Sequence, residues 1–241
     1  MAEVIMEPMH QKDSPRFEDF THIVVFDLET TGFSPLTDEP IEFAAVILKK
    51  TQTTFETTKT INAFIKAKTP LPDKIKTLTN ISDENVESGI EPKQLANIIA
   101  EYFTNDALII AYNIVFDMGF VDAIMKKHRP DFHFKGAMLD MMCVYKDRHS
   151  YPHRLENAVA TYAVDIPNSH RAIDDTRALA ALLMKMHEAE ALEIYINSIG
   201  YNPKYTPPKR RYPQIDYFPQ SQSKHDLKTK ILARRRTLFN L

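Results

Sequence analysis

The 241-residue chain has a single cysteine, few glycines and no long apolar run. A lone Cys143 cannot form an internal disulfide, which is typical of a reducing compartment, so we expect a cytoplasmic protein. The longest apolar runs, such as 107–116, end at about ten residues, short of the ~18 needed to span a membrane. The first residues are acidic and interrupted, which does not predict a signal peptide. We therefore expect no membrane partner.

Missing motifs exclude two classes of enzyme. The five glycines are spread along the chain: Gly32, Gly89, Gly119, Gly136 and Gly200. They form no glycine-rich phosphate loop, which excludes nucleotide-binding ATPases and Rossmann dehydrogenases. A G-x-S-x-G elbow is also lacking, which argues against Ser/His/Asp hydrolase chemistry. With 44% hydrophobic residues, however, the chain has enough apolar material for a core.

The net charge of −2 conceals a strong asymmetry. Residues 200–241 contain ten Lys and Arg against two acids, so this segment carries +8 and residues 1–199 carry −10. An acidic body indicates carboxylates gathered for metal ions, and a basic tail indicates an anionic partner. A disordered basic end on an ordinary domain explains the same charges, and composition does not choose between the two.

The hydrophobic pattern predicts three parts: a flexible lead-in (1–20), an α/β domain (21–199) and a proline-rich basic tail (200–241). Expected strands are 23–29, 41–50, 54–67 and 107–112, the second and third forming an antiparallel hairpin. Expected helices begin near Pro92 and cover 115–128, 154–162 and 171–186. The tail contains five prolines between 202 and 226, which predicts a linker or recognition segment outside the core, followed by a short basic helix at 227–239.

The sharpest local feature is the pair Asp27 and Glu29 at the end of the first strand. Residues two apart on a strand project to the same face, so the two carboxylates repel each other unless a cation lies between them. Oxygen ligands in this arrangement suit Mg²⁺ or Mn²⁺. The alternative is an exposed strand face, but 23–26 read as a fully buried strand, where such a pair is costly. The pattern favours a metal site.

Two further acidic motifs are weak when each is taken alone. Asp117 follows a buried strand and could be a first-turn carboxylate that the helix dipole favours. His170 stands before a helix whose first turns carry Asp174 and Asp175; either aspartate could be a cap, although the neighbouring histidine is more suggestive of chemistry.

Together the three motifs resemble those of the DEDDh family of 3′→5′ exonucleases, which includes the epsilon proofreading subunit of DNA polymerase III. The matching segments are VVFDLETTG, AYNIVFDMGFV and HRAIDDTRA, and the resemblance covers about residues 22–187. A histidine five positions before the last aspartate is the mark of the h-type. One departure is Tyr112, where many members have histidine.

The resemblance implies a ribonuclease-H-like α/β fold, with a mixed central sheet flanked by helices, and a site for two Mg²⁺ or Mn²⁺ ions. The implied metal ligands are Asp27, Glu29, Asp117 and Asp175, with His170 as general base. The implied contacts to the terminal nucleotide come from Thr30, Thr31, Gly32, Phe33 and Asn113. For Phe33, ordinary packing is an equal alternative, and Asn113 could instead cap a turn.

The tail carries a separate hypothesis. Gln214-Ile215-Asp216-Tyr217-Phe218 resembles the short peptide by which bacterial replication proteins dock on the sliding clamp, with Gln214, Ile215 and Phe218 as contacts. An unstructured linker is the alternative. Arg234–Arg236 could instead contact a nucleic-acid backbone.

The sequence therefore predicts a metal-dependent 3′→5′ exonuclease that acts on single-stranded or frayed DNA ends, in replication or proofreading beside a DNA polymerase. The first alternative is an exoribonuclease, because discrimination depends on contacts to the 2′-OH that the motifs do not reveal. The second is a non-catalytic binding module. It would lack an acid or the histidine, and since all five are present it ranks low.

Overall fold

The computed structural model describes residues 15–166, 170–205, 207–208 and 211–238. Most of the predicted lead-in therefore lies outside the described residues. The part that is described does not fit a flexible segment, because Phe17 is fully buried and packs edge-on against Phe55 of the third strand. Residues 15–20 thus belong to the domain, and an aromatic side chain in a polar stretch is the reason.

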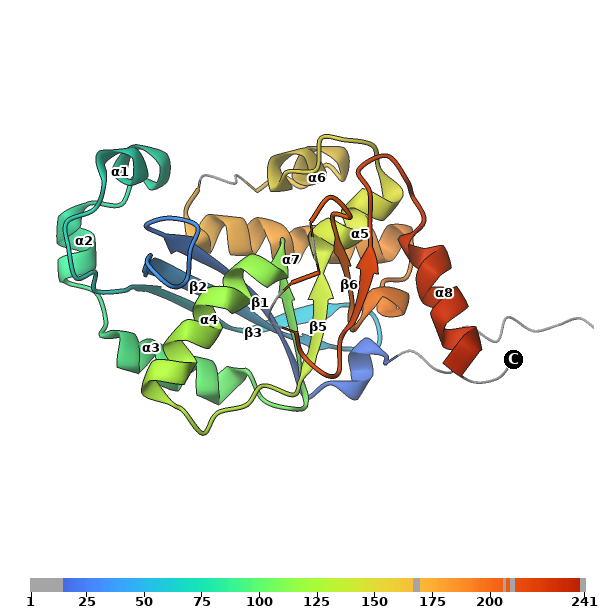
Figure 1. The fold of residues 1–241 in the computed structure, drawn as a ribbon, viewed down its shortest axis with the longest axis horizontal. Helices are drawn as coiled ribbons and strands as arrows, with labels where there is room; N and C mark the ends of the chain where they lie inside the picture. Colours follow the sequence, from blue (N-terminus) through green and yellow to red (C-terminus); the bar gives the residue numbers. More distant parts are fainter. Residues whose placement is uncertain (1–14, 167–169, 206, 209–210, 239–241) are drawn as a thin grey trace, which may run out of the picture.

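The centre of the molecule is a five-stranded mixed sheet (Figure 1). Its strands are β1 (His22–Thr30), β2 (Pro40–Lys50), β3 (Phe55–Phe64), β4 (Ala107–Ala111) and β5 (Ala137–Asp140), in the spatial order β3-β2-β1-β4-β5. β1, β2 and β3 pair antiparallel, and β1, β4 and β5 pair parallel. The predicted mixed sheet and the β2–β3 hairpin are confirmed.

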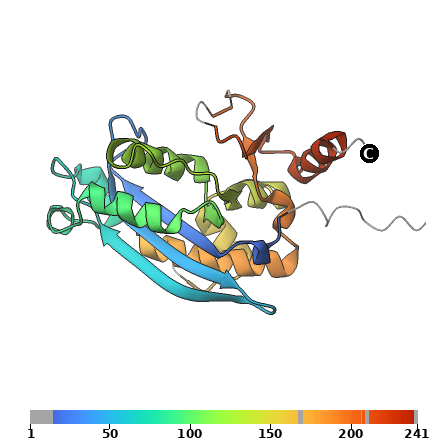
Figure 2. The same cartoon turned by 90° about the horizontal axis from the view of Figure 1, so that it is seen from below.

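Helices cover both faces of this sheet, as Figure 2 shows from below. α7 (Ala172–Ala189) packs on β1, β2 and β3, while α3 (Pro92–Tyr102) and α4 (Ile114–His128) lie together on the opposite face. Because both faces are covered, β4 is buried along its whole length. The predicted ribonuclease-H-like class is confirmed in its α/β layers.

Shorter helices complete the domain: α1 (Asp73–Thr79), α2 (Asp83–Glu87), α5 (Met141–Arg148) and α6 (Leu155–Thr161). The helices predicted at 115–128, 154–162 and 171–186 correspond to α4, α6 and α7. Strand β5 and helix α5 were not predicted, because four strand residues followed directly by a helix leave no clear periodicity in the sequence. Within the described residues, no helix has the length and hydropathy required for a membrane span.

The tail packs against the domain, so the prediction of a segment outside the core is wrong. β6 (Ser198–Tyr201) and β7 (Asp216–Pro219) form a small parallel sheet, and α8 (Leu227–Leu238) follows. Isolated apolar side chains hold this segment in the main core: Ile215, Phe218, Leu227 and Ile231. Ile215 and Phe218 lie among prolines and polar residues, so they do not stand out in the sequence. The expected basic helix is present as far as Leu238.

Candidate metal centre

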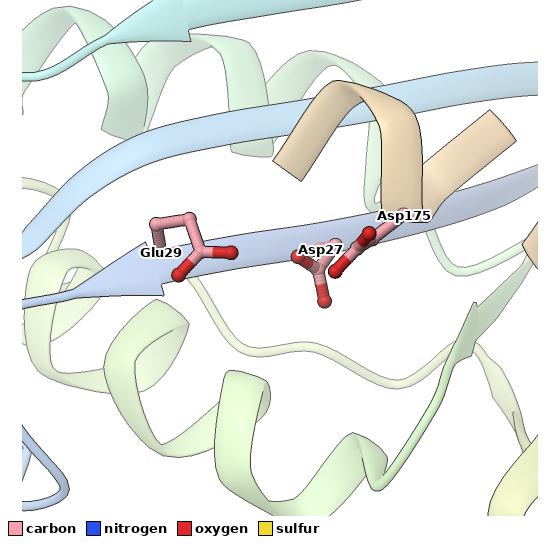
Figure 3. A group of neighbouring side chains, drawn as sticks. All are labelled: Asp27, Glu29 and Asp175. Carbon is pink, nitrogen blue, oxygen red and sulfur yellow. The ribbon is translucent and has the colours of Figure 1, made fainter. Parts of the chain in front are cut away.

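Three carboxylates meet at the end of β1. Asp27 and Glu29 project from the same face of that strand, and Asp175 reaches them from the first turn of α7 (Figure 3). One carboxylate oxygen from each residue lies within 4.8 Å of the others. The spacing of two along a strand and the packing of α7 on β1 are what bring them together.

The fourth predicted acid, Asp117, comes from the opposite helical layer. It lies in the first turn of α4, which follows β4, and β4 is the parallel neighbour of β1. Asp117 is buried, and its charge is the strongest of the neighbouring charges that raise the pKa of Asp27. The backbone N–H groups of Asp117 itself and of Leu28 hydrogen-bond to its carboxylate and partly offset the rise that burial causes in its own pKa.

The site favours protonated carboxyls unless positive charge is supplied. Burial, followed by the charges of Asp117, Glu29 and Asp175, raises the pKa of Asp27 well above its usual range. Burial and neighbouring acids likewise raise the pKa of Glu29 to about 8, against a lowering influence of Arg171. A donor set made only of carboxylate oxygens fits hard divalent cations such as Mg²⁺ and Mn²⁺. The residues present therefore suit a divalent metal ion.

His170 lies at the edge of this cluster in sequence, immediately before Arg171, which caps α7. Its side chain is exposed, and its φ of 54° is in the left-handed region. It is not part of the group formed by Asp27, Glu29 and Asp175. Its catalytic role stays a prediction.

The residues predicted to meet the terminal nucleotide form a hydrogen-bonded loop after β1. The Thr30 hydroxyl donates to the Gly32 carbonyl over 2.6 Å, and Thr31 exchanges two hydrogen bonds with Glu39, at 2.9 and 3.0 Å. Phe33 is 88% exposed at the tip, where ordinary core packing is excluded, and its ring lies 6.3 Å from that of Phe116. The loop thus presents an aromatic face to solvent.

Asn113 begins α4 with φ at 72°, a conformation that asparagine tolerates better than most residues. Its N–H donates to the carboxylate of the buried Asp140 over 3.1 Å. Asp140 also accepts from the N–H groups of Met142 and Cys143 at the start of α5, so it joins the second acidic motif to β5. Sequence reasoning missed Asp140, although an acid between an apolar run and MMCVY is a helix-cap signal.

Glu42 is a second residue that sequence reasoning missed. It is fully buried on β2, directly opposite Glu29, and it is bonded to Arg171. The available signal was a single charge in the apolar run IEFAAVIL, since a buried carboxylate requires a partner.

The predicted clamp-binding residues face the domain. Gln214 donates to the carbonyl of Gly136 over 2.9 Å, and Ile215 and Phe218 are buried. Their apolar side chains are therefore covered by this chain's own core.

The chain is similar to known proteins over most of its α/β domain. The sequence model of the family described as Exonuclease matches residues 24–183. A Bacillus subtilis protein, DNA polymerase III PolC-type, is 34% identical over 167 residues, which is 68% of this chain but 11% of that protein. The chain thus spans about a tenth of the length of the curated relatives it matches.

Solved structures show the same fold. E. coli Exonuclease I in complex with a dT13 oligonucleotide superposes with a TM-score of 0.59 at 20% identity, covering 69% of this chain and 41% of that one. The nuclease domain of 3′hExo, a DEDDh family member bound to rAMP, gives a TM-score of 0.60 at 20% identity and covers 73% of this chain and 96% of that one.

Proposed function

The chain belongs to the exonuclease family, and we propose that it removes nucleotides one by one from the 3′ end of single-stranded or frayed DNA with the help of two divalent metal ions. The observation that carries this proposal is the group formed by Asp27, Glu29 and Asp175, whose carboxylate oxygens lie within 4.8 Å of one another. Asp117 adds a fourth charge to the same site.

Bound Mg²⁺ or Mn²⁺ would supply Lewis-acid stabilisation of the charge that develops on the phosphate oxygens. Asp27 and Glu29 on β1 and Asp175 on α7 would hold the ions, and Asp117 on α4 would add a fourth carboxylate. His170 takes the proton from the attacking water in this scheme. Support for this role comes from its exposed side chain and from its place two residues before the helix that carries Asp175.

The loop after β1 would receive the last nucleotide. Phe33 offers an exposed ring for stacking on a base, and stacking tolerates any base, as a general exonuclease requires. The hydroxyls of Thr30 and Thr31 hold the loop together, so their contribution is to fix Phe33 and the backbone of Gly32. Asn113 contributes in the same way, through the start of α4.

DNA is the proposed substrate because two PolC-type relatives, named as DNA polymerases, are 34% and 32% identical to this chain over the matched region. RNA is the second candidate, favoured by the structural likeness to a DEDDh nuclease domain bound to the ribonucleotide rAMP. The deciding experiment uses matched DNA and RNA oligonucleotides labelled at the 5′ end. Progressive shortening with retention of the label supports 3′→5′ cleavage, and faster trimming of RNA would refute the DNA assignment.

A DNA polymerase is the proposed partner, since the PolC-type relatives carry the matching region as part of a polymerase chain. A sliding clamp stays a prediction, because docking through Ile215 and Phe218 would require these buried side chains to leave the core. Co-elution with a bacterial clamp, with Gln214→Ala as the variant that leaves the buried anchors intact, tests it. Unchanged co-elution of this variant would remove Gln214 from the interface.

A further inference from the structure

An ion pair between Glu42 and Arg171 stands directly beside the carboxylate cluster, and the chemistry above does not use it. The Arg171 guanidinium donates through Nε and Nη2 to the two carboxylate oxygens of Glu42, both over 3.0 Å. The backbone N–H of Ala172, the first residue of α7, donates to the same carboxylate over 3.0 Å. Glu42 is fully buried. A buried carboxylate with a two-point arginine partner is a geometrically strict contact.

The position of Glu42 in the sheet links this pair to the site. Across the antiparallel strands, Glu42 is in register with Glu29 on one side and with Phe64 on the other. Residues in register on neighbouring strands share a face, here the face on which α7 packs. The Arg171 guanidinium lies over the Phe64 ring, 5.1 Å from its centre. The arginine is therefore held by a carboxylate and by an aromatic ring.

The same contact continues into the metal centre. The backbone carbonyl of Arg171 accepts the N–H of Asp174 and of Asp175, each over 3.0 Å, in the first turn of α7. The backbone position of Asp175 is thus set by a residue that Glu42 fixes to β2. His170 is the residue on the other side of Arg171.

We propose that Glu42 and Arg171 are positioning residues that fix the first turn of α7 against β2 and so hold Asp175 at the distance from Asp27 and Glu29 that a divalent ion requires. The inference rests on the proposed function, since it concerns the same site. The ion pair has a second consequence. Because Glu42 holds the Arg171 guanidinium, the arginine does not occupy the place of a metal ion beside Glu29.

Calorimetric titration of the full chain with Mn²⁺ tests the inference without a nuclease reaction. Glu42→Gln keeps the size of the side chain and loses the charge, and Arg171→Lys keeps the charge and loses the two-point contact. We expect each to raise the Mn²⁺ dissociation constant by about tenfold or more, the usual effect of removing a partner that orients a metal ligand. The double variant is expected to bind Mn²⁺ no less tightly than the single variant with the higher dissociation constant, because both substitutions remove the same interaction.

Glu190→Gln is the matched control, since Glu190 pairs with Arg148 at 3.4 Å at the other end of α7. Its Mn²⁺ affinity should equal that of the wild type. Thermal unfolding shows which variants are folded. If Glu42→Gln is not folded, the Mn²⁺ affinity of Arg171→Lys alone tests the inference, because that variant leaves Glu42 with a cation as partner. Mn²⁺ dissociation constants within twofold of the wild type in the folded variants would overturn the inference.

A second readout separates positioning from a general loss of stability. If Glu42 acts through the metal ligands, excess Mn²⁺ should restore most of the nuclease rate of Glu42→Gln; an unchanged deficit at saturating Mn²⁺ contradicts the inference. A wild-type protein that binds Mn²⁺ in a Glu42-dependent manner yet degrades neither DNA nor RNA would refute the proposed function and leave the positioning pair in place.

Discussion

Two acidic sites in this molecule have opposite surroundings: the carboxylate cluster at the end of β1 and the single acid Asp147 on α5. At the end of β1, Asp27 lies among Glu29, Asp117 and Asp175, and these like charges raise its pKa. Where α5 meets the tail, the buried Asp147 instead accepts three hydrogen bonds. They come from the Tyr195 hydroxyl at 2.9 Å and from the backbone N–H groups of Leu227 and Lys228, at 2.7 and 2.9 Å.

The difference lies in what surrounds each carboxylate rather than in the residue type. Asp147 serves as a cap for the first turn of α8, although it is contributed by another helix, and its charge is compensated by donors. The cluster on β1 concentrates negative charge that only an external cation compensates fully. A buried acid with many donors therefore stabilises the fold, and acids that repel one another at a sheet end indicate a site for metal ions.

The comparison is tested most severely by removing one carboxylate of the cluster. We expect Asp27→Ala or Asp175→Ala to lower the nuclease rate by ~10³-fold or more, because loss of a metal ligand removes several kcal/mol of transition-state stabilisation. Circular dichroism should show an intact fold. Glu190→Gln, far along α7 in sequence, is the control, and undiminished cleavage by both alanine variants would refute the assigned site.

The second test removes the carboxylate of Asp147, which accepts three hydrogen bonds. Asp147→Ala leaves the Tyr195 hydroxyl and the first N–H groups of α8 without their acceptor, which should cost about 3 kcal/mol of unfolding free energy. Tyr195→Phe removes only one donor and should cost about 1 kcal/mol. Chemical denaturation measures both. Mn²⁺ affinity should be unchanged in the folded state, and a parallel loss of Mn²⁺ affinity would show that the two acid groups are not independent.

The contrast also separates what the sequence could predict from what it could not. Asp27 and Glu29 are two residues apart, so their common face follows from strand geometry alone, and the order of the three motifs identified Asp117 and Asp175. The three partners of Asp147 lie 48, 80 and 81 residues further along the chain, and Arg171 lies 129 residues from Glu42. Such contacts depend on how β2, α5, α7 and α8 pack, which no local period encodes.

The tail shows the same limit for packing. Its prolines and polar residues predicted a linker up to residue 226, yet Ile215 and Phe218 in that stretch are buried. In the predicted basic helix, Leu227 and Ile231 are buried in the main core as well. Four residues apart on a helix, they share one face, and that pair was the signal available in LKTKI. Gln220 adds a polar contact, donating to the carbonyl of Cys143 over 2.8 Å. A few buried contacts are enough to hold a segment whose composition indicates solvent exposure.

The smallest expected effect concerns the metal-free protein and its dependence on pH. Glu29 has a folded-state pKa of about 8 against a usual value of 4.5, so it takes up a proton on folding, and the pKa of Asp27 is shifted in the same direction. Neither carboxyl affects the unfolding free energy below its usual pKa, where it is protonated in both the folded and the unfolded state. Each lowers the unfolding free energy as the pH rises from the usual pKa towards the raised value. In the presence of a chelator, the unfolding free energy should therefore fall between about pH 5 and pH 8.

Asp27→Asn removes one of these charges while keeping the shape of the side chain. At pH 8 without metal we expect this variant to be more stable than the wild type, because it removes a carboxylate whose pKa is raised well above its usual range by burial and by the charges of Asp117, Glu29 and Asp175. Mn²⁺ should stabilise the wild type more than the variant, because only the wild type offers the full set of ligands. The opposite result would be an Asp27→Asn protein that is less stable than the wild type at pH 8 and is stabilised as much by Mn²⁺. It would show that the Asp27 carboxylate, like that of Asp147, is compensated by hydrogen-bond donors of the fold and does not bind a metal ion.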